Sequence, residues 1–114
     1  NYQTLRTQLY SEYDAMDTDA IIASDLDILS EESTLKNDMG EVLHIRSNDE
    51  NIQKILYNLF YDVLNVEFNL SWWIRNMCKY GDFFLKLEAS EKYGVYNVIP
   101  FAAFNTTILF SSIL

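Results

Sequence analysis

The feature that most constrains the fold of this chain is an apolar stripe between residues 52 and 66. Its side chains recur at helical spacing and fill an arc of about 140° on a helical wheel. They are Ile52, Ile55, Leu56, Leu59, Phe60, Val63 and Val66. A stripe of this width predicts a helix that packs on a hydrophobic core. The preceding run, 47–50, predicts a capping box with Ser47 as N-cap and Glu50 at the third helical position.

Weaker patterns predict the other elements. Apolar spacing predicts a helix over 2–12, a second helix that starts at Asp17 as N-cap and ends near residue 32, and a third over 70–80 with Gly81 after its last turn. Residues 37–40 favour a turn, and 41–46 a short strand. Alternation over 82–88 and 95–99, with a turn at 91–94, predicts a hairpin. The expected fold is α+β: amphipathic helices packed with a short strand and a C-terminal β-hairpin.

Charge and composition exclude several classes of protein. The 114 residues carry a net charge of −9, and residues 1–50 hold 12 acidic and 3 basic side chains. Such a chain is a poor candidate for binding a phosphate backbone. A single cysteine cannot form an internal disulfide. No apolar run reaches the roughly 20 residues of a membrane span, so no membrane contact is expected. The first residue is Asn1, so we expect a piece of a longer protein.

Catalytic and metal-binding patterns are weak. His44 and Cys78 are the only histidine and cysteine, and nothing in their spacing brings them together as base and nucleophile. The carboxylates between residues 17 and 32 do not fit a calcium loop, because Ile21 and Ile22 occupy the fifth and sixth positions. The three glycines stand alone and form no phosphate loop. We therefore predict no catalytic residue, no cofactor and no metal.

Three residues are candidates for an interface. Trp72 lies among polar residues, nearly opposite the apolar face of the helix predicted over 70–80. It could stack on Arg75, stack on a nucleic-acid base, or insert into another part of the chain or a neighbouring subunit, and the last interpretation is favoured. Asp25 lies inside the apolar arc of the helix after Asp17. It either has a partner or lies in the seam between two stripes that pack in different directions.

The ordered set of sequence runs resembles the early part of portal proteins of contractile-tailed (myovirus-type) bacteriophages. The resemblance covers about residues 10–101. It is carried by Met16–Ala23, Leu26–Thr34, Asn65–Leu70, Trp73–Arg75 and Lys79–Lys86. It implies that residues 1–100 form an α+β region of the N-terminal, wing-like part of a portal. Residues 101–114 remain an unmatched apolar terminus, interpreted as truncated or misread.

The resemblance also implies a function. Portal proteins are structural components of the virion, assembled in the host cytoplasm as homo-oligomeric rings of about twelve subunits. Double-stranded DNA passes through the ring during packaging and ejection without sequence-specific binding. The partners implied are the capsid, the terminase and the neck proteins, and no enzymatic activity is implied. Where the family has a small apolar residue, this chain has Asp25. The alternative hypothesis is an acidic intracellular module that recruits a basic partner protein.

Overall fold

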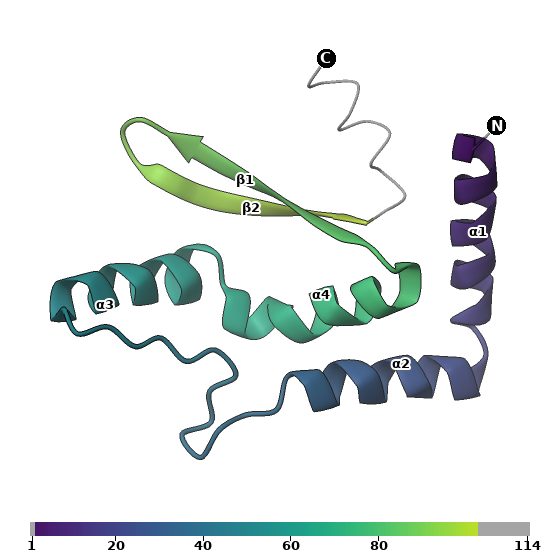
Figure 1. The fold of residues 1–114 in the computed structure, drawn as a ribbon, viewed down its shortest axis with the longest axis horizontal. Coiled ribbons are helices and arrows are strands. Elements are labelled where there is room, and N and C mark those ends of the chain that lie inside the picture. Colours follow the sequence, from purple (N-terminus) through teal and green to yellow (C-terminus); the bar gives the residue numbers. More distant parts are fainter. Residues whose placement is uncertain (1, 103–114) are drawn as a thin grey trace.

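The computed structural model describes residues 2–102 and folds them into helices and one β-hairpin (Figure 1). The elements are α1 (Tyr2–Met16), α2 (Ala20–Ser33), α3 (Glu50–Tyr57), the π-helix η1 (Asn58–Val63), α4 (Val66–Tyr80), β1 (Phe83–Ser90) and β2 (Gly94–Ala102). This is the α+β fold that the sequence predicts. Of the unmatched terminus, residues 103–114 lie outside the described residues.

The elements lie side by side in a single layer. In Figure 1, α2 and α4 run next to each other in opposite directions, α1 stands across their end, and α3 precedes α4. The hairpin lies along the other side of α4. The extents of the molecule are 50 × 41 × 17 Å. Viewed along the shortest of these extents, no helix lies in front of another, so the helices form one layer (Figure 1).

The helix starts differ from the predicted ones. Asp19 is the N-cap of α2, and its carboxylate accepts hydrogen bonds from the backbone N–H groups of Ile21 (2.9 Å) and Ile22 (3.2 Å). The prediction of Asp17 as N-cap is therefore wrong. At α3 the N-cap is Asp49, and the Ser47 hydroxyl instead accepts from the Asp49 N–H at 3.2 Å. The predicted capping box is wrong for the same reason: a carboxylate nearer the first turn takes the free N–H groups.

The long helix predicted over 52–66 is interrupted before its end. The chain passes from α3 into η1, which ends at Val63, and Asn65 adopts a left-handed conformation with φ of 48°. Asparagine tolerates this conformation better than most residues with a side chain. The next helix, α4, therefore begins at Val66 and not at residue 70. It ends as predicted at Gly81, with φ of 81° and its N–H donating to the Met77 carbonyl at 2.8 Å.

The strand predicted over 41–46 does not form. The Glu67 carboxylate accepts from the backbone N–H groups of both Val42 (2.7 Å) and Leu43 (2.9 Å). Successive N–H groups of a strand point to opposite sides, so a single carboxylate cannot accept from both. The Tyr61 hydroxyl also donates to the Leu43 carbonyl. These bonds hold the segment in an irregular conformation against η1 and α4.

The predicted hairpin is confirmed and is longer than expected. The strands β1 and β2 are antiparallel, with Leu85 opposite Pro100 and Leu87 opposite Val98. The register shifts between Glu88 and Ala89, where Tyr96 is an extra residue on β2. Among the described residues these two strands form a sheet of their own.

The buried core is small. Tyr10, Leu64 and Trp73 are the apolar side chains that are buried, at 6 to 8% exposure, in the part of the chain that the structure describes. The stripe that the sequence assigns to a core helix is half open, because Ile52 is 50% exposed and Ile55 is 66% exposed. Across residues 2–102, no helix has both the length and the hydrophobicity to cross a membrane.

Candidate interface

Arg75 joins the first two helices to α4. Its guanidinium donates to both carboxylate oxygens of Asp17, from Nη1 at 2.9 Å and from Nη2 at 2.6 Å. Its Nε donates to Oδ1 of Asp27, on α2, at 2.7 Å. Asp17 belongs to the short link between α1 and α2. This paired, two-bond geometry is the strongest form of a charged hydrogen bond in proteins.

Lys79 extends the same cluster by one turn of α4. Its ammonium lies 2.9 Å from Oδ2 of Asp17 and 2.8 Å from Oδ1 of Asp14, at the end of α1. The Tyr80 hydroxyl also donates to Asp14. The side chains of Asp17, Arg75 and Lys79 are 17%, 22% and 12% exposed, so water screens this cluster only in part. We call this set of side chains the charged cluster: Asp14, Asp17, Asp27, Arg75, Lys79 and the hydrogen-bonded Tyr80.

The cluster shifts the proton affinity of its members. Arg75 first, and then Lys79, hold the pKa of Asp17 well below its usual value. Hydrogen bonds from Lys79 and Tyr80 lower the pKa of Asp14. Burial by itself would lower the pKa of Lys79, but Asp14 and Asp17 outweigh it, and the pKa is raised. Asp14, Asp17, Arg75 and Lys79 therefore stay charged near neutral pH, and their ion pairs hold α1 and the link after it against α4.

A second set of contacts, nearer the N-terminus of α1, holds this helix against the end of α4 and the start of β1. Arg6 donates to Asp82, which precedes β1, at 2.7 Å, and its Nε donates to the Tyr10 hydroxyl. The buried Tyr10 ring meets Tyr80 edge-on, with centroids 5.6 Å apart. The contacts come from one side of α1 only. On the same helix Tyr2 is 73% exposed and Leu5 is 55% exposed.

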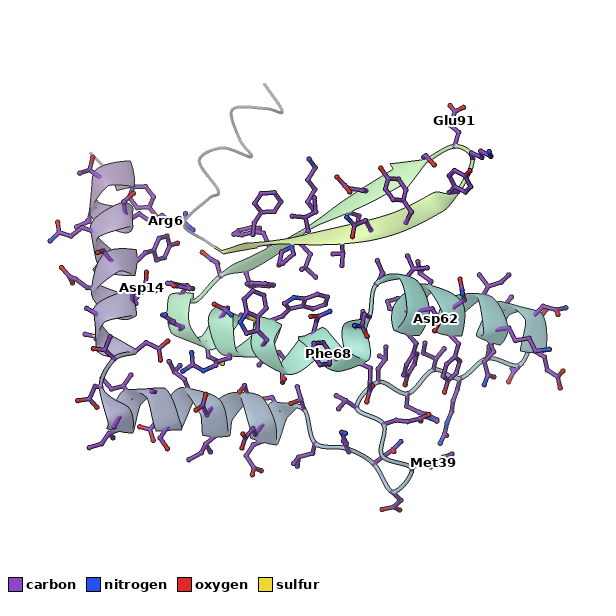
Figure 2. The ribbon with its side chains drawn as sticks, turned by 180° about the vertical axis from the view of Figure 1, so that it is seen from behind. Arg6, Asp14, Met39, Asp62, Phe68 and Glu91 are labelled. Atoms are coloured by element: carbon purple, nitrogen blue, oxygen red, sulfur yellow. The ribbon has the colours of Figure 1, made fainter. Side chains whose placement is uncertain are left out.

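The two neighbouring tryptophans of α4 have different environments. Trp73 is buried, and its ring lies 6.4 Å from the ring of Phe83 on β1. Trp72 meets the same Phe83 edge-on at 6.0 Å, yet 51% of it remains exposed. Phe68 lies one helical turn before Trp72 and is 78% exposed; Figure 2 shows it on α4. The exposed aromatic rings thus form a row on the surface of α4.

The three interface candidates from the sequence do not lie together as a unit. Arg75 directs its donors at Asp17 and Asp27, so its guanidinium serves contacts within the chain. Asp25 is exposed on α2 and has no ionic or hydrogen-bonded partner. Trp72 alone presents a large apolar surface to solvent. Whether it contacts another subunit stays a prediction.

His44 and Cys78, the two residues considered for catalysis, lie on different segments of the chain. His44 lies between Glu41 and Arg46, with its Nδ1 3.2 Å from the Glu41 carboxylate. Cys78 is exposed on α4. Three of the carboxylates between residues 17 and 32 have structural partners: Asp19 caps α2, and Asp17 and Asp27 bind Arg75. Within residues 2–102, no group of three or more potential ligands could hold a metal ion.

A hollow of about 650 Å³ lies between the end of α2, the 35–42 segment and the start of α4. Glu67 is in its wall and holds Val42 and Leu43, as described above. Burial by itself would raise the pKa of Glu67, but the two backbone N–H donors outweigh it, and the pKa is lowered. Burial, followed by the negative charge of Glu67, raises the pKa of Tyr61. The polar groups of this wall are used to shape the loop, while Leu35 and Phe68 stay exposed.

The exposed apolar surface is the dominant property of the molecule. Twenty large apolar side chains of the described residues are exposed, and they include residues of all four α-helices and both strands. The radius of gyration is 17.2 Å, where a compact chain of this length has about 13 Å. The accessible surface is 8453 Å², where a compact monomer of this mass has about 6,500 Å². The excess, about 2,000 Å², exceeds the share of one partner in a standard protein interface.

Of the residues described above, the sequence pattern identifies Trp72 but not the charged cluster. The charged cluster joins residues more than 45 positions apart, and no local spacing announces such contacts. Trp72 could be identified from the sequence because it lies on the polar side of its own helix. Comparison with known proteins adds nothing further: no protein-family model, curated protein or solved structure matches this chain.

Proposed function

We propose that this chain is a piece of the wing region of a phage portal protein and that it works without catalysis, by assembling into a ring. The proposal joins two kinds of support. One is the ordered resemblance of residues 10–101 to portal proteins. The other is the single-layer shape, with apolar surface open on several elements. The second observation carries the assembly part of the proposal, and the first specifies the kind of assembly.

The exposed apolar surface supports the assembly part of the proposal. A soluble domain normally packs two or more layers around a shared core. Large exposed apolar patches mark sites where other polypeptide binds. This layer leaves about 2,000 Å² more surface open than a compact monomer does. In the proposed assembly, that surface is covered by the remainder of the portal subunit and by neighbouring subunits.

Trp72 is the side chain that we expect to matter most in these contacts. Tryptophan is enriched among residues that dominate binding energy. Half of its surface is already covered by its own chain, including Phe83, so its ring is held in place before any partner arrives. Little conformational entropy is then lost on binding.

The proposal is tested on the longer protein that contains this segment. A portal requires a pair of long stem helices and a clip in the sequence after this region. Electron microscopy of the purified longer protein should show closed rings with a central channel. In Trp72→Ala we expect fewer rings, and in the control Tyr93→Ala, which removes an exposed ring at the hairpin tip, an unchanged number. Monomers or open filaments of the unmodified protein would overturn the proposal.

The alternative, an acidic module for a basic partner, has one observation in its favour. The charged cluster neutralises Asp14, Asp17 and Asp27, but Asp25 and Glu32 on α2 stay exposed. Binding to a lysine-rich peptide that weakens steeply with salt would support it. Asp25→Asn should then reduce binding, whereas the portal proposal predicts no such binding.

A further inference from the structure

The two outer edges of the hairpin are not equivalent. On β2, Pro100 carries no N–H group and Tyr96 forms a bulge. Both features hinder the addition of a further strand. On β1, residues 83–90 contain neither a proline nor a bulge. In Figure 1 the two strands cross: from the crossing to the turn, β2 faces α3 and β1 lies on the outer side, whereas the first residues of β1 lie next to α4. Toward the turn, the edge of β1 is therefore the open one.

The position of Pro100 indicates which backbone groups of β1 face outward. A proline within a sheet has its nitrogen on the outer side of an edge strand. Residues directly opposite in an antiparallel pair either both point inward or both point outward. Leu85, opposite Pro100, therefore directs its N–H and C=O groups away from β2. Because the pattern repeats every second residue, Leu87 and Ala89 do the same.

We propose that β1 is a self-pairing edge: it binds the β1 strand of a second copy of this chain, antiparallel, about a two-fold axis at Leu87. Residues 84–90 of the two copies then form the centre of a four-stranded sheet. Leu87 lies opposite Leu87 of the partner subunit, and Leu85 lies opposite Ala89 of the partner subunit. On the other face, Lys86 lies opposite Glu88 of the partner subunit, and the reverse pair follows by symmetry.

Charge selects this register from its neighbours. A two-fold axis at Lys86 or at Glu88 places two like charges directly opposite each other, which is destabilising. An axis at Leu85 sets Lys86 against Phe84 and gives Glu88, which accepts a hydrogen bond from Asn97, no opposite charge on the second copy. Registers that set outward-facing residues against inward-facing ones lose the ladder hydrogen bonds. The axis at Leu87 satisfies the outward groups and both pairs of charges.

The exposure of the strand and the size of the sheet favour the same pairing. Leu85 is 43% exposed and Leu87 is 56% exposed, and each gains an apolar neighbour across the new ladder. An isolated two-stranded hairpin is marginally stable, and three or more strands with an apolar face, or packing against a helix, are needed for a sheet to be stable on its own. The surface buried by one added strand is below that of standard interfaces, so the pairing is weak and concentration-dependent.

This inference stands on the hairpin and does not require the portal proposal. A two-fold contact is self-complementary, whereas a ring closes through head-to-tail contacts on two different surfaces. Either proposal can therefore fail without the other.

The test is a charge exchange across the proposed axis. The mass of the 114-residue chain is measured by sedimentation over a concentration series, and we expect it to rise from 13.4 kDa toward twice that value. Lys86→Glu and Glu88→Lys each place like charges opposite each other twice, so each should associate about tenfold more weakly. An equimolar mixture of the two variants restores both pairs and should regain the association of the unmodified chain. Helical circular dichroism checks that each variant is folded.

Cross-linking tests the register separately. In a Cys78→Ser background, Leu87→Cys places two thiols opposite each other, with Cα atoms about 5.5 Å apart, within the reach of a disulfide. Oxidation should yield a covalent dimer, whereas Tyr93→Cys, at the far ends of the sheet, should not. A chain that stays at 13.4 kDa, a mixture that associates no better than the single variants, or equal cross-linking at both positions would overturn the proposal.

Discussion

Asp17→Asn removes the charge that holds three helices together. Asp17 accepts two hydrogen bonds from Arg75 and one from Lys79, and its side chain is 17% exposed. The amide keeps one acceptor oxygen in place of two, and it loses the ionic attraction to both cations. Arg75 and Lys79 are then left partly buried with too few acceptors.

The expected loss lies between two known limits. Exposed ion pairs contribute about 0–1 kcal/mol, and breaking a fully buried pair costs about 3–5 kcal/mol. Because the side chains of Asp17, Arg75 and Lys79 are 12 to 22% exposed, we expect a loss of about 2 kcal/mol in the free energy of unfolding at pH 7. In a chain of this length such a loss lowers the melting temperature by about 10 °C.

The pH dependence gives the prediction a second signature. The pKa of Asp17 is depressed in the folded chain. A carboxyl of this kind stabilises the fold fully above its unfolded pKa, near about 4, and loses that contribution as the pH falls toward its folded pKa. The difference between the unmodified chain and Asp17→Asn should therefore be constant at neutral pH. Below about pH 4 it should shrink.

The assay is urea unfolding followed by the fluorescence of Trp72 and Trp73, repeated at pH 7 and at pH 3. Asp25→Asn is the matched control, because it makes the same chemical change at an exposed carboxylate without a partner. We expect it to stay within about 0.5 kcal/mol of the unmodified chain. Equal stability of the two variants, or a difference that persists unchanged at pH 3, would refute the role of the charged cluster.

Three further changes test other parts of the structure. Trp73→Ala should lower the free energy of unfolding by about 3–5 kcal/mol, because its ring is one of the few that are buried. Glu67→Gln should speed amide hydrogen exchange at Val42 and Leu43, since each N–H now donates to a different carboxylate oxygen and the NH₂ group that replaces one of them cannot accept; unchanged exchange would contradict the account of this loop. Gly81→Ala should cost about 1–2 kcal/mol in thermal unfolding, because φ at this position is 81°.

Local patterns predicted the elements of the fold well. The hairpin, the end of α4 at Gly81 and the helix at the start of the chain follow from alternation, a helix-ending glycine and apolar spacing. The predictions were wrong where a side chain formed a contact with a residue far away in the sequence. Glu67 prevents the strand over 41–46, and it does so from 24 residues away. Asp17 resembles a helix cap in the sequence but binds Arg75 in the fold.

The apolar stripe over 52–66 illustrates a different limit. The sequence correctly indicated an amphipathic helix, but the structure leaves Ile52 and Ile55 exposed. Periodicity shows which side of a helix is apolar and cannot show what covers it. The same holds for Trp72, which the helical wheel marks as unusual without naming its partner. In the proposed assembly, the burial of these side chains depends on polypeptide outside the described layer.

The central claim, that other polypeptide covers this layer, is tested most directly by the accessibility of Trp72. In a Trp73→Phe background Trp72 is the only tryptophan of the chain, and acrylamide quenching of its fluorescence reports its exposure. The account predicts strong quenching in the isolated chain, where the side chain is 51% exposed, and weak quenching in the assembled longer protein. Equally strong quenching in both states would contradict it.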